Sequence, residues 1–148
     1  MTPEAVLAAV PQQEPFRFID EILELGDDHI VAATTFRPDA EFYRGHFPGN
    51  PITPGVILIE AMAQAGVVAL GIHLLERELG AEESAKYTTL FTDAEVEFSG
   101  VVEPGTRVVT TGKLVFFRRR KLRAAVEMKR EDGTLVCSGR LSGMGVRK

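Results

Sequence analysis

The sequence predicts an α+β domain in which a curved antiparallel sheet surrounds a single long helix. An apolar run of helix length occupies residues 54–79, and segments on either side alternate apolar and polar residues with the two-residue period of half-buried strands. The 148 residues, of which 45% are apolar, suit one domain with its own core. We therefore expect residues 1–148 to form a single domain.

Capping and turn residues define the N-terminal elements. A short helix is expected over Thr2–Val10, with Thr2 as its N-cap and Pro3 at its first position. Two extended segments follow at about Phe16–Leu25 and His29–Arg37, and the Gly-Asp-Asp sequence between them supplies a turn.

The central segment combines a stiff loop with the long helix. Residues 45–55, GHFPGNPITPG, hold three prolines, each of which fixes a dihedral angle and removes a backbone donor. This segment therefore fits neither a regular strand nor a helix interior. The helix is expected over Pro54–Leu79, capped by Thr53 and ended by Gly80.

The remaining segments predict an antiparallel meander. Residues 93–99 and 122–129 alternate apolar with polar side chains, and the sequences Pro104-Gly105 and Asp132-Gly133 are typical of turns. The expected strands are residues 93–99, 106–117, 122–129 and 134–146.

Composition restricts the classes of function. A net charge of −4 does not indicate a nucleic-acid-binding protein. Because Cys137 is the only cysteine, the chain can form neither an internal disulfide nor a cysteine-based metal cluster, which fits a reducing cytoplasm. Residues 1–11 lack a basic segment followed by an apolar run, so no secretory signal is predicted.

Residues 54–75 are long enough to cross a bilayer, which needs roughly 20 residues. However, Glu60 and Gln64 lie inside this stretch, and a carboxylate in the middle of a membrane span is costly. We therefore expect the buried helix of a soluble fold, without membrane insertion.

Three residues suggest proton-transfer chemistry. His46 lies in the stiff loop and Glu60 on the helix, and an imidazole with a carboxylic acid is the usual pair for proton transfer near neutral pH. Burial beside an apolar helix should raise the pKa of the acid. The amide of Gly55 lies in the first turn of the helix, where an anion or a polarised carbonyl is stabilised. Together these groups suggest proton abstraction beside a thioester carbonyl.

Each of these residues also has a structural interpretation. A single loop histidine is more often structural than catalytic. Glu60 could pair with a buried arginine or point into an oligomer interface, and Gln64, one helical turn further on, could be a satisfied interior amide. His29 and His73 are expected at surface or helix-side positions, without a function. No spacing indicates a metal site, a phosphate loop or a dinucleotide fingerprint.

The run GHFPGNPITPGVILIEAMAQ, residues 45–64, closely resembles the signature of bacterial 3-hydroxyacyl-[acyl-carrier-protein] dehydratases. The resemblance extends to residues 15–20, 93–98 and 102–105, so it spans most of the chain. It implies a hot-dog fold, in which an antiparallel sheet wraps a long helix. It also implies homodimers with active sites at the subunit interface, where the histidine comes from one chain and the acid from the other.

By motif position, the resemblance assigns roles to five residues. His46 matches the catalytic histidine and Glu60 the catalytic acid. The amide of Gly55 matches the group that binds the thioester carbonyl, the carbonyl of Ile52 orients the histidine, and Gln64 is a polar neighbour of the acid. The implied reaction needs no metal or other cofactor.

Glutamate rather than aspartate at position 60 resembles the general dehydratase branch, which often assembles as a trimer of dimers. One departure concerns residues 12–15, Gln-Gln-Glu-Pro, where that branch commonly has a His-Arg-Tyr-Pro type of sequence. This difference affects the expected tunnel entrance and the chain-length preference, but not the catalytic pair.

The expected activity is dehydration of a 3-hydroxyacyl group on acyl carrier protein to a trans-2-enoyl group, in fatty-acid or related lipid or polyketide biosynthesis. Two alternatives remain: a hot-dog acyl thioesterase, and a non-catalytic partner subunit of a dehydratase. A basic cluster is a candidate docking surface for the acidic carrier, or else a solvated hairpin turn. Nucleic acid is a poorer partner, because no aromatic residue interleaves these charges. The cluster comprises Arg118, Arg119, Arg120, Lys121 and Arg123.

Overall fold

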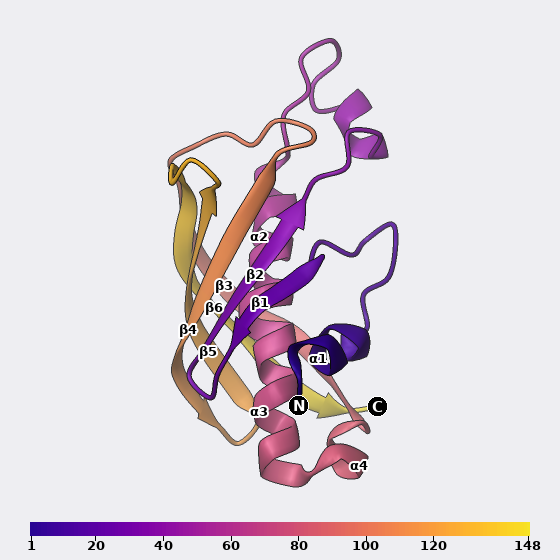
Figure 1. Ribbon diagram of the computed structural model, residues 1–148, viewed down its shortest axis with the longest axis vertical. Coiled ribbons are helices and arrows are strands. Elements are labelled where there is room, and N and C mark those ends of the chain that lie inside the picture. Colours follow the sequence, from indigo (N-terminus) through magenta and orange to yellow (C-terminus); the bar gives the residue numbers. More distant parts are fainter.

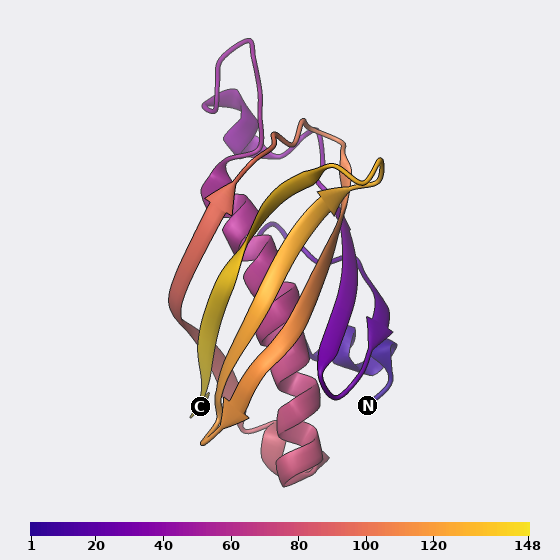
Figure 2. The ribbon, with the colours of Figure 1, turned by 90° about the vertical axis from the view of Figure 1, so that its left-hand side faces the viewer.

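The computed structural model describes residues 1–148 and contains one six-stranded antiparallel sheet that curves around a long helix (Figures 1 and 2). The strand order is β1-β2-β4-β5-β6-β3, so β1 and β3 are the two edges. The strands are β1 (Glu21–Leu25), β2 (His29–Thr35), β3 (Tyr87–Phe98), β4 (Arg107–Arg118), β5 (Lys121–Arg130) and β6 (Leu135–Arg147). The helices are α1 (Pro3–Ala9), the 3-10 helix η1 (Glu41–Arg44), α2 (Gly55–Ala63), the π-helical segment η2 (Gln64–Ala69), α3 (Leu70–Leu79) and α4 (Ala81–Ser84).

The central helix runs without a break from Gly55 to Leu79 through α2, η2 and α3. Gly80 ends it with a φ of 87°, as expected for a glycine C-cap. In the middle the helix lies very close to the sheet, because a Cβ added at Gly112 of β4 would be only 3.0 Å from the Cα of Gly66. Glycine at both positions is therefore what allows helix and sheet to approach.

By length and composition this helix could cross a membrane, but 67% of its most apolar stretch is buried within the chain. Its side chains belong to one core that also includes the inward-facing residues of the sheet, among them Ile30, Val126 and Leu141. The alternating burial of β5 shows the same arrangement from the side of the sheet. The apolar surface of the helix is thus used to build the core.

Two sequence predictions are wrong in detail. The first strand begins at Glu21 rather than at Phe16, because the side chain of Gln64 binds the backbone of Phe16 and Phe18. Thr53 does not cap the helix: Pro54 occupies the N-cap position, and the Thr53 hydroxyl instead bonds the hydroxyl of Tyr43. The N-cap role of Thr2, which accepts from the amide of Ala5, is confirmed.

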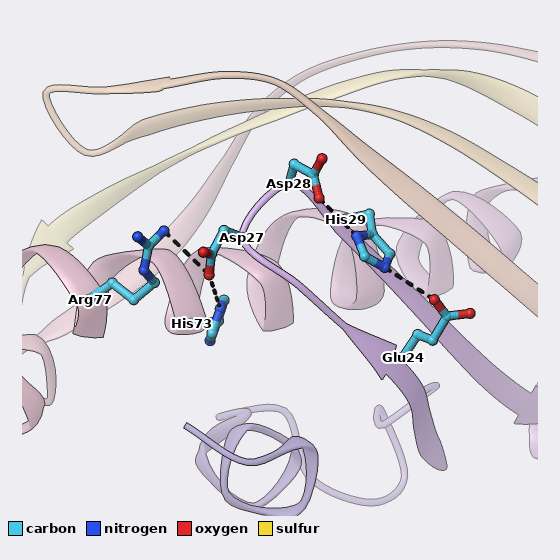
Figure 3. A network of polar contacts seen from close by, with 6 residues as sticks. All are labelled: Glu24, Asp27, Asp28, His29, His73 and Arg77. Atoms are coloured by element: carbon cyan, nitrogen blue, oxygen red, sulfur yellow. Dashed lines mark hydrogen bonds and ion pairs between the residues drawn. The ribbon is translucent and has the colours of Figure 1, made fainter.

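The turn between β1 and β2 is attached to α3 by the Asp27 carboxyl group, which contacts His73 and Arg77 (Figure 3). An Asp27 oxygen lies 3.1 Å from Nε2 of His73 and 3.3 Å from Nη1 of Arg77. His73 is therefore a buried residue on the side of α3 with a structural partner, within the surface or helix-side positions expected from the sequence. Next to it, His29 lies between Asp28 and Glu24, whose hydrogen bonds raise the pKa of its imidazole.

Candidate active site

His46 follows η1, in the loop that projects beyond the end of the sheet at the top of Figures 1 and 2. Its amide donates to the carbonyl of Phe42, and its own carbonyl accepts from the amide of Ile52. The ring nitrogen Nδ1 lies 3.0 Å from the carbonyl oxygen of Ile52. Because a carbonyl only accepts, Nδ1 carries the hydrogen in this bond, and in a neutral ring Nε2 keeps its lone pair.

Gly55 begins the central helix a few residues further on. Pro54, the N-cap, has no side-chain donor or acceptor, and the Gly55 amide makes no hydrogen bond within the chain. The ring of Phe98 covers Gly55 on the side where a side chain would lie, since a Cβ added there would be 3.1 Å from the ring. The result is a free amide at the positive end of a long helix, at a position where glycine avoids a close contact with that ring.

Glu60 lies on α2, half-buried, with its carboxyl group held by Gln64. The Gln64 amide group donates to Oε2 of Glu60 at 2.8 Å and to the Phe16 carbonyl at 2.9 Å, while Oε1 of Gln64 accepts from the Phe18 amide at 2.7 Å. Burial raises the pKa of the Glu60 carboxyl, and the bond from Gln64 offsets part of that rise. Glu60 is therefore biased toward the protonated form that a general acid needs.

Gln64 is fully buried (0% exposed), and both of its amide atoms have partners within the chain. In this arrangement it orients Glu60 and the N-terminal segment, and it offers no surface to a substrate. The prediction that Gln64 neighbours the acid agrees with this geometry.

Within one chain, none of the four principal cavities is lined by His46, Gly55 or Glu60. A cavity of about 290 Å³, lined mostly by apolar residues, lies at the other end of the central helix beside α4 and the start of β3. No cluster of three His, Cys, Asp or Glu side chains is spaced to hold a metal ion. The candidate catalytic groups thus lie at the surface of the single chain, at the end where the helix begins.

The basic cluster lies on the β4–β5 hairpin, at the opposite end of the sheet from the His46 loop (Figures 1 and 2). Lys121 and Arg123 both approach Asp93, at 4.0 and 3.3 Å, so part of their charge is neutralised within the chain. The guanidinium of Arg118 lies over the ring of Phe116. Arg119, at the turn, has no ion-pair partner in the chain.

Two aromatic rings lie beside the basic cluster, although none stands within its run of charges in the sequence. The guanidinium of Arg123 lies 5.7 Å from the centre of the Phe116 ring, and that of Arg120 lies 5.3 Å from the centre of the Tyr87 ring. Both rings are covered by arginine, so they are not free platforms on which a base could stack.

Sequence reasoning missed three residues that shape this end of the molecule. Tyr43 and Thr53 join their hydroxyls beneath the His46 loop, and Phe98 packs on Gly55. Tyr43 is an aromatic residue of a short 3-10 helix and Phe98 is at the end of a distant strand, so only the folded chain brings them to the site.

Comparison with known proteins identifies the family. The model of the FabA-like domain family matches residues 10–140. The 3-hydroxyacyl-[acyl-carrier-protein] dehydratase FabZ proteins of Streptococcus pyogenes serotypes M3 and M1 are each 38% identical over 140 residues, which cover 93% of this chain and 93% of theirs.

Solved structures show the same fold at lower identity. The dehydratase heterocomplex ApeI:P from Xenorhabdus doucetiae superposes with a TM-score of 0.73 at 20% identity, over 100% of this chain and 93% of that chain. A thioesterase from Haemophilus influenzae superposes with a TM-score of 0.69 at 19% identity, over 99% of this chain and 92% of its own. The fold is therefore the hot-dog fold, as predicted. By the family match and the identity to FabZ proteins, this chain belongs to the FabA-like family of 3-hydroxyacyl-[acyl-carrier-protein] dehydratases.

Proposed function

We propose that this chain is a hydro-lyase that converts (3R)-3-hydroxyacyl-[acyl-carrier-protein] to the trans-2-enoyl thioester, in fatty-acid or related lipid or polyketide biosynthesis. The observation that carries the proposal is the combination, at one end of the central helix, of an oriented imidazole, a free helix-start amide and a carboxyl group with a raised pKa. Similarity to the FabZ dehydratases over 93% of the chain supports the same reaction.

His46 acts as the base in this mechanism. The Ile52 carbonyl holds Nδ1–H, so Nε2 presents its lone pair and removes a proton from C2, the carbon next to the thioester carbonyl. Negative charge moves onto the thioester oxygen as this bond breaks. The amide of Gly55, at the positive end of the helix, donates a hydrogen bond to that oxygen and stabilises the enolate-like charge.

Glu60 acts as the acid. Its protonated carboxyl gives a proton to the 3-hydroxyl group, the C3–O bond breaks, and the electron pair of the former C2–H bond forms the C2–C3 double bond. Water leaves with the proton that Glu60 has given, and His46 holds the proton taken from C2. Transfer of one proton from His46 to Glu60 restores both groups before the next cycle. No electrons are exchanged with any other group, and the same route run backwards hydrates the enoyl thioester.

The activity is tested with purified protein and crotonyl or 3-hydroxyacyl thioesters, following the absorbance of the conjugated enoyl group. We expect turnover in the wild type and a loss of about 10²-fold or more in His46→Ala and Glu60→Gln, since general acid–base catalysis contributes about 10²–10⁴-fold. His29→Ala, which removes an imidazole far from the helix start, is the matched control. Full turnover in either catalytic variant would exclude this assignment.

We further propose a homodimer in which Glu60 faces His46 of the partner subunit. The edge strand β3 has a free side, and the large apolar residues Leu90 and Phe98 on it are exposed, as is Val56 on α2. A long apolar edge of this kind is a surface for pairing with a second copy, which would extend the sheet across both chains. We also propose that three of these dimers assemble into one hexamer, a trimer of dimers.

Subunit complementation tests the shared site. When the inactive His46→Ala and Glu60→Gln subunits are mixed and allowed to exchange, half of the dimers are mixed and one of their two sites is intact, so about a quarter of the wild-type activity should return. Sites built within one chain would give no recovery. Light scattering on the same samples gives the size of the assembly.

We propose that the carrier protein docks on the β4–β5 hairpin. Arg118 and Arg119 are exposed, and Arg119 has no ion pair within the chain, so they are the members of the basic cluster best placed to meet an acidic partner. Reversal of both to glutamate should raise the Michaelis constant for carrier-bound substrate alone. An equal rise for a small pantetheine thioester would contradict docking.

Residues 1–148 are proposed to act as one catalytic domain in the cytoplasm, where fatty-acid synthesis supplies the substrate. Thioesterases share this fold, as the Haemophilus influenzae structure illustrates. Release of free thiol without enoyl formation would support that alternative. If folded protein forms neither free thiol nor enoyl thioester, the result would support a non-catalytic partner subunit. One assay therefore separates the three functions.

A further inference from the structure

A buried hydroxyl pair lies beneath the loop that carries His46. The Tyr43 hydroxyl is 2.6 Å from Oγ1 of Thr53, and the two residues are only 5% and 4% exposed. Burial raises the pKa of the Tyr43 phenol, so it is a neutral hydrogen-bonding group at physiological pH. The pair belongs to the core below the site and does not touch the reacting groups.

The position of the pair in the chain gives it a mechanical role. Tyr43 lies on η1, three residues before His46, and Thr53 lies between Ile52, whose carbonyl orients His46, and Pro54, which precedes Gly55. The Thr53 amide also donates to the Val102 carbonyl at 2.8 Å, which ties this point to the β3–β4 connection. The two ends of the His46 loop are therefore joined to each other and to the sheet.

We propose that Tyr43 and Thr53 are positioning residues that hold the His46 imidazole in register with the Gly55 amide. This inference rests on the proposed dehydratase function. The base and the helix-start amide must act on adjacent atoms of one thioester, and a misplacement of about 1 Å can cost about 10²-fold in rate. The hydroxyl pair is the side-chain link that spans the loop between these two groups, and it uses the Thr53 hydroxyl that would otherwise cap the helix.

A double-mutant cycle separates positioning from simple stabilisation. Tyr43→Phe and Thr53→Val each leave one buried hydroxyl without its partner and should lower the melting temperature. The double variant Tyr43→Phe/Thr53→Val leaves no unpaired hydroxyl and should recover most of the melting temperature. If the pair positions the loop, kcat of the double variant stays about tenfold below wild type with KM within about twofold. Recovery of kcat together with the melting temperature would overturn the proposal.

A matched control and a second readout complete the test. Thr110→Val, which changes an equally buried threonine in β4, should leave kcat unchanged. The imidazole nitrogen spectrum, with the His46 signals identified by His46→Ala, reports the tautomer held by Ile52. Loss of a single Nδ1–H tautomer in the double variant supports positioning, and an unchanged spectrum contradicts it. This readout needs no turnover, so it tests the positioning role even if the wild type is inactive. Inactivity of the wild type would refute the proposed function and leave the test of positioning intact.

Discussion

The substitution Gly55→Ala separates the role of the helix-start amide from that of the fold. The added Cβ would lie 3.1 Å from the end of the Phe98 ring, which is closer than an ordinary contact. Only the end of the flexible Phe98 side chain makes this contact, so a shift of a few tenths of an ångström relieves it. Alanine also favours a helix over glycine by up to about 1 kcal/mol. The two effects on stability oppose each other, and we expect the free energy of unfolding to change by less than about 1 kcal/mol.

The expected effect on catalysis is much larger. We expect the new methyl group, attached to the carbon next to the Gly55 amide nitrogen, to hinder the approach of the thioester oxygen to that amide. Loss of one donor of this kind costs about 10²–10³-fold in kcat, or about 2.7–4 kcal/mol of transition-state stabilisation. Because the stability change is smaller than this loss, a folded and nearly inactive enzyme is expected. The measurement is kcat by enoyl absorbance beside a thermal melt of the same sample.

Two further variants make the result specific. Gly71→Ala places a methyl group on the same helix at an ordinary 3.7 Å from Thr89, so it should stabilise the helix without loss of kcat. Phe98→Leu combined with Gly55→Ala relieves the ring contact but leaves the methyl group beside the amide. Wild-type kcat in Gly55→Ala would refute the assignment of the amide. Full recovery in the combined variant would show that the displaced ring, and not the blocked amide, caused the loss.

Three further predictions follow from pKa values that the fold shifts. Because burial raises the pKa of Glu60, the folded chain loses stability as pH rises past the pKa that a glutamate has in the unfolded chain. The melting temperature of Glu60→Gln should therefore exceed that of the wild type at pH 8, and the two melting temperatures should converge near pH 4. Gln64→Leu removes a hydrogen bond that lowers the pKa of Glu60, so the alkaline limb of the kcat/KM profile should move to higher pH. If that limb does not move, Glu60 is not the group that titrates there. Asp28 and Glu24 raise the pKa of His29, so the stability that they give is present below the pKa of His29 in the unfolded chain and is lost as pH rises through its pKa in the folded chain. In thermal melts, the melting temperature of His29→Gln should lie below that of the wild type at pH 5, and the difference should disappear by pH 8.

The sheet and the central helix could be predicted from sequence because both depend on local periodicity. Alternation in residues 122–129 gave β5, and Gly80 correctly marked the end of the helix. The π-helical segment from Gln64 to Ala69 could not be foreseen, because an apolar run of this kind contains no signal for a wider turn. Residues 16–20 have the composition of a strand, but a side chain 46 residues away from Phe18 binds that backbone instead.

Part of the candidate site, too, could be predicted from the sequence, and part could not. His46, Ile52 and Gly55 are close in sequence, and the prolines between them make their arrangement readable from the motif. Thr53 was misread because a threonine before a proline at a helix start is a common cap, and its actual partner, Tyr43, contributes no sequence signal. The proposed pairing of Glu60 with His46 of a second subunit is not encoded by spacing in one chain.

The carboxyl group of Glu60 is unfavourable for folding, and this supports a catalytic role. Burial raises the pKa of this carboxyl, so an uncharged residue in its place should make the helix more stable. Gln64 differs, because its amide satisfies two backbone groups as well as the acid. The core around Gly66 and Gly112 is tight enough to hold the helix despite this cost. A structural role for Glu60 would need a buried cation beside it, yet its carboxyl group has no ion pair within the chain and its hydrogen-bond partner is a neutral amide. The stabilising effect expected of Glu60→Gln, together with its loss of turnover, is therefore the pattern that distinguishes a catalytic acid from a structural one.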